Sequence, residues 1–134
     1  MEDSQAAPLI RKVDSLQLRV ADVDAALEFY RDRLGHTLVW RTETAAGLAM
    51  AESDTELVLQ SERETELDLL VESADAAADR FVEAGGKLVA GPFDVQVGRA
   101  AVVEDQWGNR LVLLDMSKGR LVTDADGNIT GNEP

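Results

Sequence analysis

The chain has 134 residues and a formal net charge of -13, from 26 acidic and 13 basic side chains. This length suits one domain with its own core, and the acidic balance argues against nucleic acids and anionic membranes as partners. Cysteine is absent, which excludes disulfides and thiol chemistry. No apolar run approaches the ~18 residues of a membrane span, and the acidic N-terminus, 1–12, lacks the apolar region of a signal peptide. We therefore expect a cytoplasmic protein.

The first half of the chain predicts one strand, one helix and three further strands. Residues 1–12 are small and polar at their start, which favours a flexible N-terminal arm. Apolar and polar residues alternate over 16–20, the pattern of a strand with one apolar face. Helical spacing of apolar residues follows Asp22 and stops at Gly35. Turn residues then separate three short segments that favour strands, at 36–41, 46–52 and 55–60.

The second half predicts the same order of elements. A strand at 67–71 precedes a helix at 74–84, which two glycines stop. Strands follow at 87–90, 99–104 and 110–114, with a tight turn at 105–109 before the last one. After Asp115 the periodicity fades. We expect residues 116–134 to form a C-terminal tail with a turn at 124–128, either alone or in a small hairpin, and a loose end.

The two halves repeat each other at a distance of 51 residues. Leu16, Asp24 and Gly35 of the first half fall on Leu67, Asp75 and Gly86 of the second. Self-similarity at a fixed period is the mark of a duplicated module. The sequence therefore predicts a single domain over 13–115, built from modules 13–62 and 63–115.

Four local motifs accompany this order: VAD at 20–22, FYRDRLG at 29–35, EAGG at 83–86 and VEDQWGN at 103–109. With them the chain resembles the vicinal oxygen chelate superfamily, which includes glyoxalase I, extradiol dioxygenases, methylmalonyl-CoA epimerase and the bleomycin-resistance proteins. Gln106 departs from the proline that is usual in the family. The resemblance implies an α+β fold in which two tandem βαβββ modules form a curled mixed sheet around a concave cavity, with helices on the outer face. It also implies a homodimer.

In the metal-using members, the resemblance implies one ligand from the first strand and one from the last strand of each module, usually His or Gln and Glu. Carried onto this chain, these positions are Ser15, Val58, Glu66 and Val112. Valine has no lone pair to offer and a serine hydroxyl is a weak ligand, so only Glu66 could coordinate. A shift of two residues keeps the same strand face and gives Gln17, Gln60, Asp68 and Leu114, three oxygen ligands without an imidazole. We expect no metal and no cofactor, and leave open a weakly bound divalent metal.

The period of two in strands divides the side chains between the two faces of the sheet. The helix-facing set is Leu16, Leu18, Val20, Leu57, Leu59, Leu67, Leu69, Val71, Leu111 and Leu113. The opposite parity places Leu70 and nine candidate ligand-binding residues on the concave side: Ser15, Gln17, Arg19, Val58, Gln60, Glu66, Asp68, Val112 and Leu114. Trp40, at the end of its strand, is a tenth candidate because a flat ligand would stack on its indole. Trp107 lies in a tight turn, where we favour a structural role.

Apolar walls with a few polar groups suit a small organic ligand. We therefore predict a homodimeric glyoxalase- or bleomycin-resistance-like protein that binds a small organic molecule without a metal. The same face could instead pack against a partner subunit, with Arg19 paired to Glu66 or Asp68. A third possibility is a structural module whose concave face is filled by its own side chains.

An enzyme of the same superfamily is the main alternative: a lyase, isomerase or dioxygenase-type protein. Without a metal, Glu66 or Asp68 would act as the general base, provided that burial and the neighbouring carboxylate raise a pKa. With a weakly bound divalent metal, the chain would be closer to the glyoxalases.

Overall fold

The computed structural model describes residues 7–133. Residues 1–6, half of the predicted arm, and Pro134 lie outside the described residues. The elements run in the order β1 (Lys12–Arg19), α1 (Val23–Leu27), η1 (Glu28–Arg33), β2 (Leu38–Arg41), β3 (Ala45–Ala49), β4 (Glu56–Gln60), β5 (Glu66–Leu70), α2 (Ala74–Glu83), β6 (Lys87–Val95), β7 (Gly98–Glu104), β8 (Arg110–Leu114), β9 (Arg120–Thr123) and β10 (Ile129–Glu133). No helix in 7–133 is long and apolar enough to cross a membrane.

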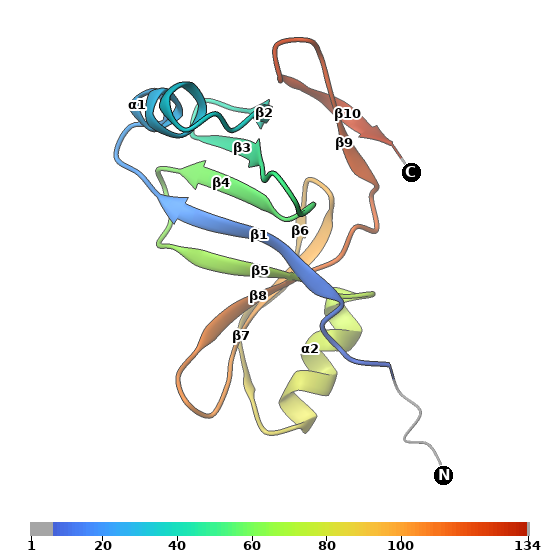
Figure 1. Ribbon diagram of the computed structural model, residues 1–134. Helices are drawn as coiled ribbons and strands as arrows, with labels where there is room; N and C mark the ends of the chain where they lie inside the picture. The colour runs from blue at the N-terminus through green and yellow to red at the C-terminus, as the bar shows by residue number, and fades with distance from the viewer. Residues whose placement is uncertain (1–6, 134) are drawn as a thin grey trace.

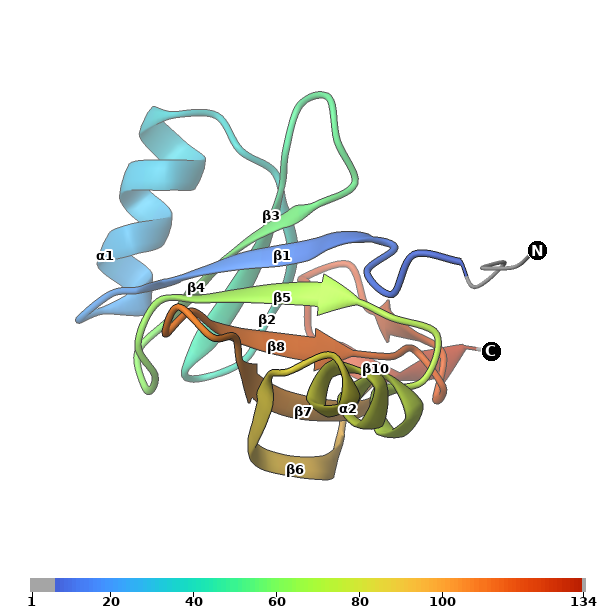
Figure 2. The same cartoon turned by 90° about the horizontal axis from the view of Figure 1, so that it is seen from below.

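Eight of the strands form one curled sheet in the order β2-β3-β4-β1-β5-β8-β7-β6 (Figures 1 and 2). The central strand β1 runs parallel to β4 and antiparallel to β5. Leu16 lies directly opposite Leu67, its counterpart 51 residues later, so the two modules are related by a rotation about this point. The predicted α+β fold with two βαβββ modules is confirmed.

The predicted division of side chains between the two faces is also confirmed for the helix side. Leu16, Leu18, Leu57 and Leu59 pack with Leu27 of the first helix. In the second module Leu67, Leu69, Val71, Leu111 and Leu113 pack with Ala77 and Phe81 of α2. Each helix therefore covers one half of the sheet, α1 near β3 and β4, and α2 over β6, β7 and β8.

The first helix begins as predicted, because the carboxylate of Asp22 accepts a hydrogen bond from the backbone N–H of Asp24 (2.9 Å) and so caps α1. Its second part, η1, is π-helical: the backbone N–H of Leu34 donates to the carbonyl of Phe29 (3.0 Å), five residues back. Gly35 follows with φ +84, a left-handed conformation that ends the helix.

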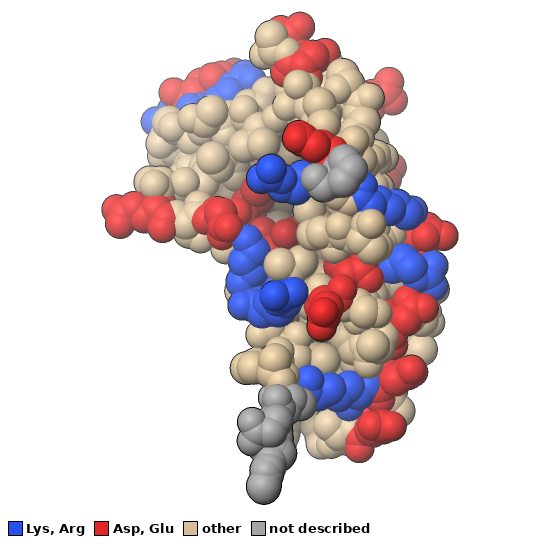
Figure 3. Space-filling model, turned by 90° about the vertical axis from the view of Figure 1, so that its right-hand side faces the viewer, with Lys and Arg blue, Asp and Glu red and all other residues tan. Residues whose placement is uncertain are grey.

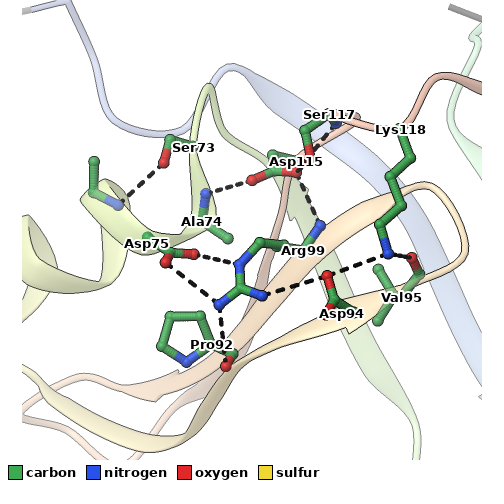
Figure 4. Close-up of polar contacts among 11 residues, drawn as sticks. Ser73, Ala74, Asp75, Pro92, Asp94, Val95, Arg99, Asp115, Ser117 and Lys118 are labelled. Carbon is green, nitrogen blue, oxygen red and sulfur yellow. Dashed lines mark hydrogen bonds and ion pairs between the residues drawn. The ribbon is translucent and has the colours of Figure 1, made fainter.

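A buried carboxylate ties the start of α2 to the ends of β7 and β8 (Figure 4). Asp115 is 4% exposed. Its Oδ2 accepts from the backbone N–H of Ala74 (2.8 Å), and its Oδ1 accepts from the N–H of Arg99 (2.9 Å) and the hydroxyl of Ser117 (2.7 Å). A Cβ on Gly98 would lie 2.3 Å from the same Oδ1, so only glycine fits there. Burial acts to raise the pKa of Asp115, but these donors outweigh it and hold the pKa below its usual range.

The C-terminal segment differs from the expected loose end. Strands β9 and β10 form an antiparallel hairpin around the predicted turn. The N–H of Arg41, at the edge of the curled sheet, donates to the carbonyl of Gly127 (2.8 Å). At the other end of the sheet, the side chains of Gln96 and Asn132 share a hydrogen bond of 2.6 Å. The hairpin thus contacts both ends of the curled sheet through hydrogen bonds of backbone and side-chain amide groups. Contacts of this kind produce no hydrophobic periodicity in the sequence.

Candidate functional site

A short polar row crosses the three central strands on the concave face of the sheet. Ser15 of β1 lies opposite Glu56 of β4 on one side and opposite Asp68 of β5 on the other. Residues directly opposite each other in a sheet share a face, and Asp68 belongs to the parity that faces away from the helices. Glu56, Ser15 and Asp68, the polar row, therefore point the same way from neighbouring strands. Two members were predicted as site residues, whereas Glu56 was not.

Asp68 is the most unusual group of this row. Asp68 is only 6% exposed. Gln17 Nε2 donates a hydrogen bond to its Oδ2 (2.9 Å). Its other oxygen, Oδ1, has no hydrogen-bond partner among residues 7–133. Burial, followed by the hydrogen bond and negative charge of the neighbouring Glu66 carboxyl, raises the pKa of Asp68 to about 9. At neutral pH Asp68 is thus a neutral acid.

The pKa values of Asp14 and Glu56 are also raised. Burial is the largest cause for both. Asp14 occupies an irregularity in the register of β1 between Val13 and Ser15, and its charge raises the pKa of Glu56 and of Asp68. A hydrogen bond from Trp40 lowers the pKa of Glu56 without cancelling the effect of burial. Three neighbouring carboxyl groups therefore resist ionisation together.

Arg63, in the loop between β4 and β5, is a site residue that the sequence did not indicate. Its Nη2 donates to Gln17 Oε1 (2.6 Å), and its Nε donates to Glu66 Oε1 (3.2 Å). Arg63, Gln17 and Asp68 thus form one chain of hydrogen bonds that ends at Asp68 Oδ2. Loop residues carry no period, so only the structure identifies this guanidinium.

Gln60 is buried but has a structural role. Its Oε1 accepts from the backbone N–H groups of Glu62 (2.9 Å) and Arg63 (2.7 Å), and its Nε2 donates to the carbonyl of Arg63 (2.6 Å). These bonds use the amide to hold the β4–β5 loop. The shape of this loop, in turn, places the Arg63 guanidinium beside Gln17.

The remaining predicted residues lie around the polar row. Val58 and Leu114 are buried, 3% and 7% exposed, and Val112 is half-buried opposite Asp68. Arg19 is exposed and forms an ion pair with Glu64. Within this single chain, Arg19 thus pairs with Glu64, and the alternative in which the face packs against a partner subunit stays a prediction.

Trp40 lies on the sheet at Gly47 rather than projecting freely. A Cβ on Gly47 would be 2.1 Å from the indole Nε1, so the ring occupies the space that a side chain would fill. The same Nε1 donates to Glu56 Oε1 (2.7 Å), which joins Trp40 to the polar row. Trp107, by contrast, is 81% exposed in its turn.

The side chains at the family's metal positions do not fit a metal ion. Val58 and Val112 offer no donor atom, and the Gln60 amide is used by the loop. Within the described part of the chain, no three His, Asp or Glu side chains gather closely enough to hold a metal.

Two hollows of the described surface lie away from the concave face. One, of about 270 Å³, is lined by the N-terminal segment and α2, including Arg11 and Arg80. The other, of about 340 Å³, lies beside the turn at Gly108. Figure 3 shows acidic and basic side chains interspersed over one face of the molecule. Some of these basic groups are paired with acidic ones, as Lys12 Nζ is with Asp54 (2.6 Å).

Solved structures with this architecture carry three different activities in their names. Methylmalonyl-CoA epimerase from Mycobacterium tuberculosis is 24% identical, with 82% of this chain and 91% of that chain covered and a TM-score of 0.70. A protein from Legionella pneumophila named NAD-dependent benzaldehyde dehydrogenase is 20% identical, covering 76% and 97%, with a TM-score of 0.64. Homoprotocatechuate 2,3-dioxygenase from Arthrobacter globiformis is 25% identical, with a TM-score of 0.62. The match covers 85% of this chain but only 38% of the dioxygenase chain.

These likenesses establish the fold and leave the activity open. No curated protein matches the chain. The family model described as Glyoxalase/Bleomycin resistance protein/Dioxygenase superfamily matches residues 12–113, which include all eight strands of the curled sheet except the last residue of β8. The match spans both modules and the whole polar row, and the chain therefore belongs to the glyoxalase/bleomycin resistance protein/dioxygenase superfamily.

Proposed function

We propose that this protein binds a small organic molecule on the concave face of its sheet, over the polar row, without a metal ion. The observation that carries the proposal is the unpartnered Oδ1 of Asp68, which is buried on that face. A buried polar atom without a partner costs about 1–3 kcal/mol. A ligand that bonds to this atom would remove that cost.

The surrounding groups support the proposal because each offers a different contact. Asp68 offers a proton at neutral pH, since its pKa is raised to about 9. Arg63 offers a guanidinium whose side chain is 55% exposed. Trp40 offers an aromatic surface, and Val112 an apolar one. Such mixtures of apolar area and a few oriented polar groups are typical of small-molecule sites.

We further propose that the protein is a homodimer. Strand β6 is the last strand of the sheet and exposes Leu88, Val89 and Phe93 by 42%, 36% and 42%. An exposed apolar edge strand is a site at which chains associate. A cytoplasmic location stays a prediction.

The test of the binding proposal is a small-molecule screen on protein freed of metals with EDTA. Binding is followed by two-dimensional amide NMR. We expect hits that shift the resonances of Gln17, Glu66 and Asp68, with unchanged affinity after addition of Zn²⁺ or Mg²⁺. Binding that requires a metal would overturn the metal-free proposal. If no compound shifted resonances of the concave face, the result would instead support a structural module whose concave face is filled by its own side chains. The Gln60 side chain already has such a structural role, because its amide is bonded to the β4–β5 loop.

The second candidate function is proton-transfer catalysis, which the carboxyl pair of Glu66 and Asp68 favours. A carboxyl group whose pKa is raised, as that of Asp68 is, is suited to an acid–base role near neutral pH. With a raised pKa, Asp68 would donate a proton at neutral pH, and it would act as a base only after losing that proton. Where a turnover is found, Asp68→Asn should abolish it and leave the protein folded. Unchanged turnover in this variant would remove the mechanism.

A further inference from the structure

The centre of the concave face is closed to solvent in this structure, although no helix covers it. Ser15 and Asp68 of the polar row, and Gln17 beside them, are buried. The helices pack on the opposite face of the sheet, and the two hollows described above lie elsewhere. A ligand therefore reaches these groups only after another part of the chain has moved.

The β4–β5 loop reaches the polar row, but this loop is fixed in place. The buried amide of Gln60 bonds to the backbone of Glu62 and Arg63. The Arg63 side chain in turn bonds to Gln17 and Glu66. Because these bonds hold the loop on both sides of the guanidinium, the loop is a rigid part of the wall and not the part that moves.

The C-terminal hairpin of β9 and β10 crosses the open side of the curl. Its turn is held at β2, where the N–H of Arg41 donates to the carbonyl of Gly127, and its other end is held at the β6–β7 turn, where Asn132 bonds to Gln96. In a flat sheet, the spacing of ~4.8 Å per strand would hold β2 and β6, the two ends of the sheet, about 34 Å apart. The chain from Gly127 to Asn132 spans at most about 18 Å. The hairpin therefore bridges the two ends of the curl, on the side that the helices leave free.

The hairpin is joined to the curled sheet only locally. It forms a two-stranded sheet of its own (Figure 1), which meets the curled sheet at an isolated bridge between Arg41 and Asn128. At its base, Asp115 and Lys118 fix the chain to β7 and to the β6–β7 turn, and Gly119 follows with φ +91. Segments with few buried contacts open most readily, and a hinge needs only a few residues after a rigid part.

We infer that the C-terminal hairpin, residues 119–133, is a lid over the concave face, which rotates about Gly119 to admit a ligand and then closes over it. This inference rests on the proposed function for the ligand and adds the step that controls its access. Opening breaks the contacts to β2 and to Gln96 and leaves the eight-stranded sheet intact. The motion belongs to the free protein, so its test needs no ligand.

The first test locks the hairpin to the sheet. Arg41→Cys together with Asn128→Cys places two thiols at bridge partners in a chain that has no cysteine of its own. Neighbouring strands lie ~4.8 Å apart, within the range of Cα distances that a disulfide accepts. Oxidation then holds the lid closed and reduction frees it, so one protein serves as its own control. Thiol titration establishes that the disulfide has formed.

Access to the concave face is read from the side-chain amide of Gln17, as hydrogen–deuterium exchange followed by two-dimensional NMR. We expect exchange to be about tenfold or more slower in the oxidised protein than in the reduced one, because this amide meets solvent only when the lid opens. Asn109 is the internal control. Its side-chain amide also donates to a carboxyl group, that of Asp105 (2.8 Å), but in an exposed turn, so its exchange should be the same in both forms.

A second variant opens the lid instead. Asn132→Ala removes the bonds to Gln96, and exchange of the Gln17 amide should become about tenfold faster. Glu133→Ala, at the next and exposed position of β10, is the matched control and should leave this exchange unchanged. Circular dichroism spectra establish that the variants are folded.

The lid and the binding function fail in different ways. Gln17 exchange that the disulfide does not slow, or that Asn132→Ala does not accelerate, would overturn the lid and leave any compound found by the screen in place. Failure of the two thiols to join would also overturn it, because the turn of the hairpin would then not lie on β2. Slow exchange in the locked protein, together with a screen that finds no concave-face ligand, would overturn the binding function and keep the motion of the hairpin.

Discussion

Gln17 and Asp68 are 51 residues apart, the period of the duplication, and the amide of one donates to the carboxyl of the other over 2.9 Å. The pseudo-twofold axis passes between Leu16 and Leu67, so these two counterparts lie directly opposite each other, whereas Gln17 lies opposite Glu66 and diagonal to Asp68. Gln17 and Asp68 thus occupy equivalent positions in the two modules but carry side chains of different chemistry. One supplies a neutral amide, the other an acid with a raised pKa.

This contact leads to a first prediction, for Gln17→Ala. The variant removes the only side-chain donor to Asp68 Oδ2 that is found in 7–133, and it removes an acceptor of Arg63. Because a buried carboxyl group then loses its amide donor, we expect the free energy of unfolding to fall by about 1–3 kcal/mol. Urea denaturation at pH 7 measures the change. The exposed variant Glu62→Ala serves as the control, and a loss for Gln17→Ala no larger than that of the control would contradict the prediction.

Asp68 gives a second prediction, which concerns stability as a function of pH. Its pKa is about 9 in the folded protein and near 3.8 in the unfolded chain. Between these values only the folded state holds the proton, so stability falls as the pH rises, by up to about 1.4 kcal/mol per pH unit. Asp68→Asn removes this contribution. The variant should therefore gain stability relative to the wild type as the pH is raised from 5 to 8 in urea denaturation. Parallel curves for the two proteins would show that the Asp68 pKa is not raised.

The sequence predicted the fold well because leucine parity and the repeat are both strong periodic signals. It did not predict which site residues meet. A shift of 51 residues aligns Ser15 with Glu66, but a rotation relates the modules, and antiparallel pairing places Ser15 opposite Asp68 instead. The role of Arg63 depends on a loop whose shape is set by Gln60, and no residue pattern encodes that contact. The C-terminal hairpin stayed one of two alternatives for a related reason, since the backbone and amide bonds that hold it leave no periodic signal.

Asp115 supports a third prediction, in which the pH dependence has the opposite sign. Its folded pKa is depressed, with the burial effect outweighed by the donors of Ala74, Ser117 and Arg99. Its stabilisation is therefore present above pH ~4 and is lost as the pH falls through the folded pKa. Asp115→Ala leaves four donors unpaired, the backbone N–H groups of Ala74, Arg99 and Ser117 and the Ser117 hydroxyl, and we expect a loss of about 2–4 kcal/mol at pH 7. The control is Asp126→Ala in an exposed turn. Equal melting temperatures for these two variants would contradict the prediction.

Asn132 gives a fourth prediction, on the C-terminal hairpin. Its Nδ2 donates to the carbonyls of Gln96 and Gly119, both at 3.0 Å, and its Oδ1 accepts from the Gln96 side chain. Asn132→Ala breaks all three bonds and should release the hairpin from the β6–β7 turn. We expect faster amide hydrogen exchange in β9 and β10, while exchange in α2 stays unchanged, because local opening follows local contacts. Equal exchange rates in β9 would show that the anchor does not depend on this side chain.

Gly47 gives the last prediction, because it is the position that admits the Trp40 indole to the concave face. An added Cβ would lie 2.1 Å from the indole Nε1, so Gly47→Ala must displace the ring and break its hydrogen bond to Glu56. Overpacking of this kind costs about 1–3 kcal/mol. In a Trp107→Phe background, where only Trp40 emits, the fluorescence should shift to longer wavelength as the indole becomes more exposed.

A double-mutant cycle assigns this cost to the contact. In Trp40→Leu the ring is absent, so the further change Gly47→Ala should cost little, and the two substitutions should be strongly non-additive. Denaturant titration of the four proteins measures the coupling. Additive effects would mean that Gly47 is required for some reason other than the indole. The placement of the Trp40 indole beside Glu56 would then need to be revised.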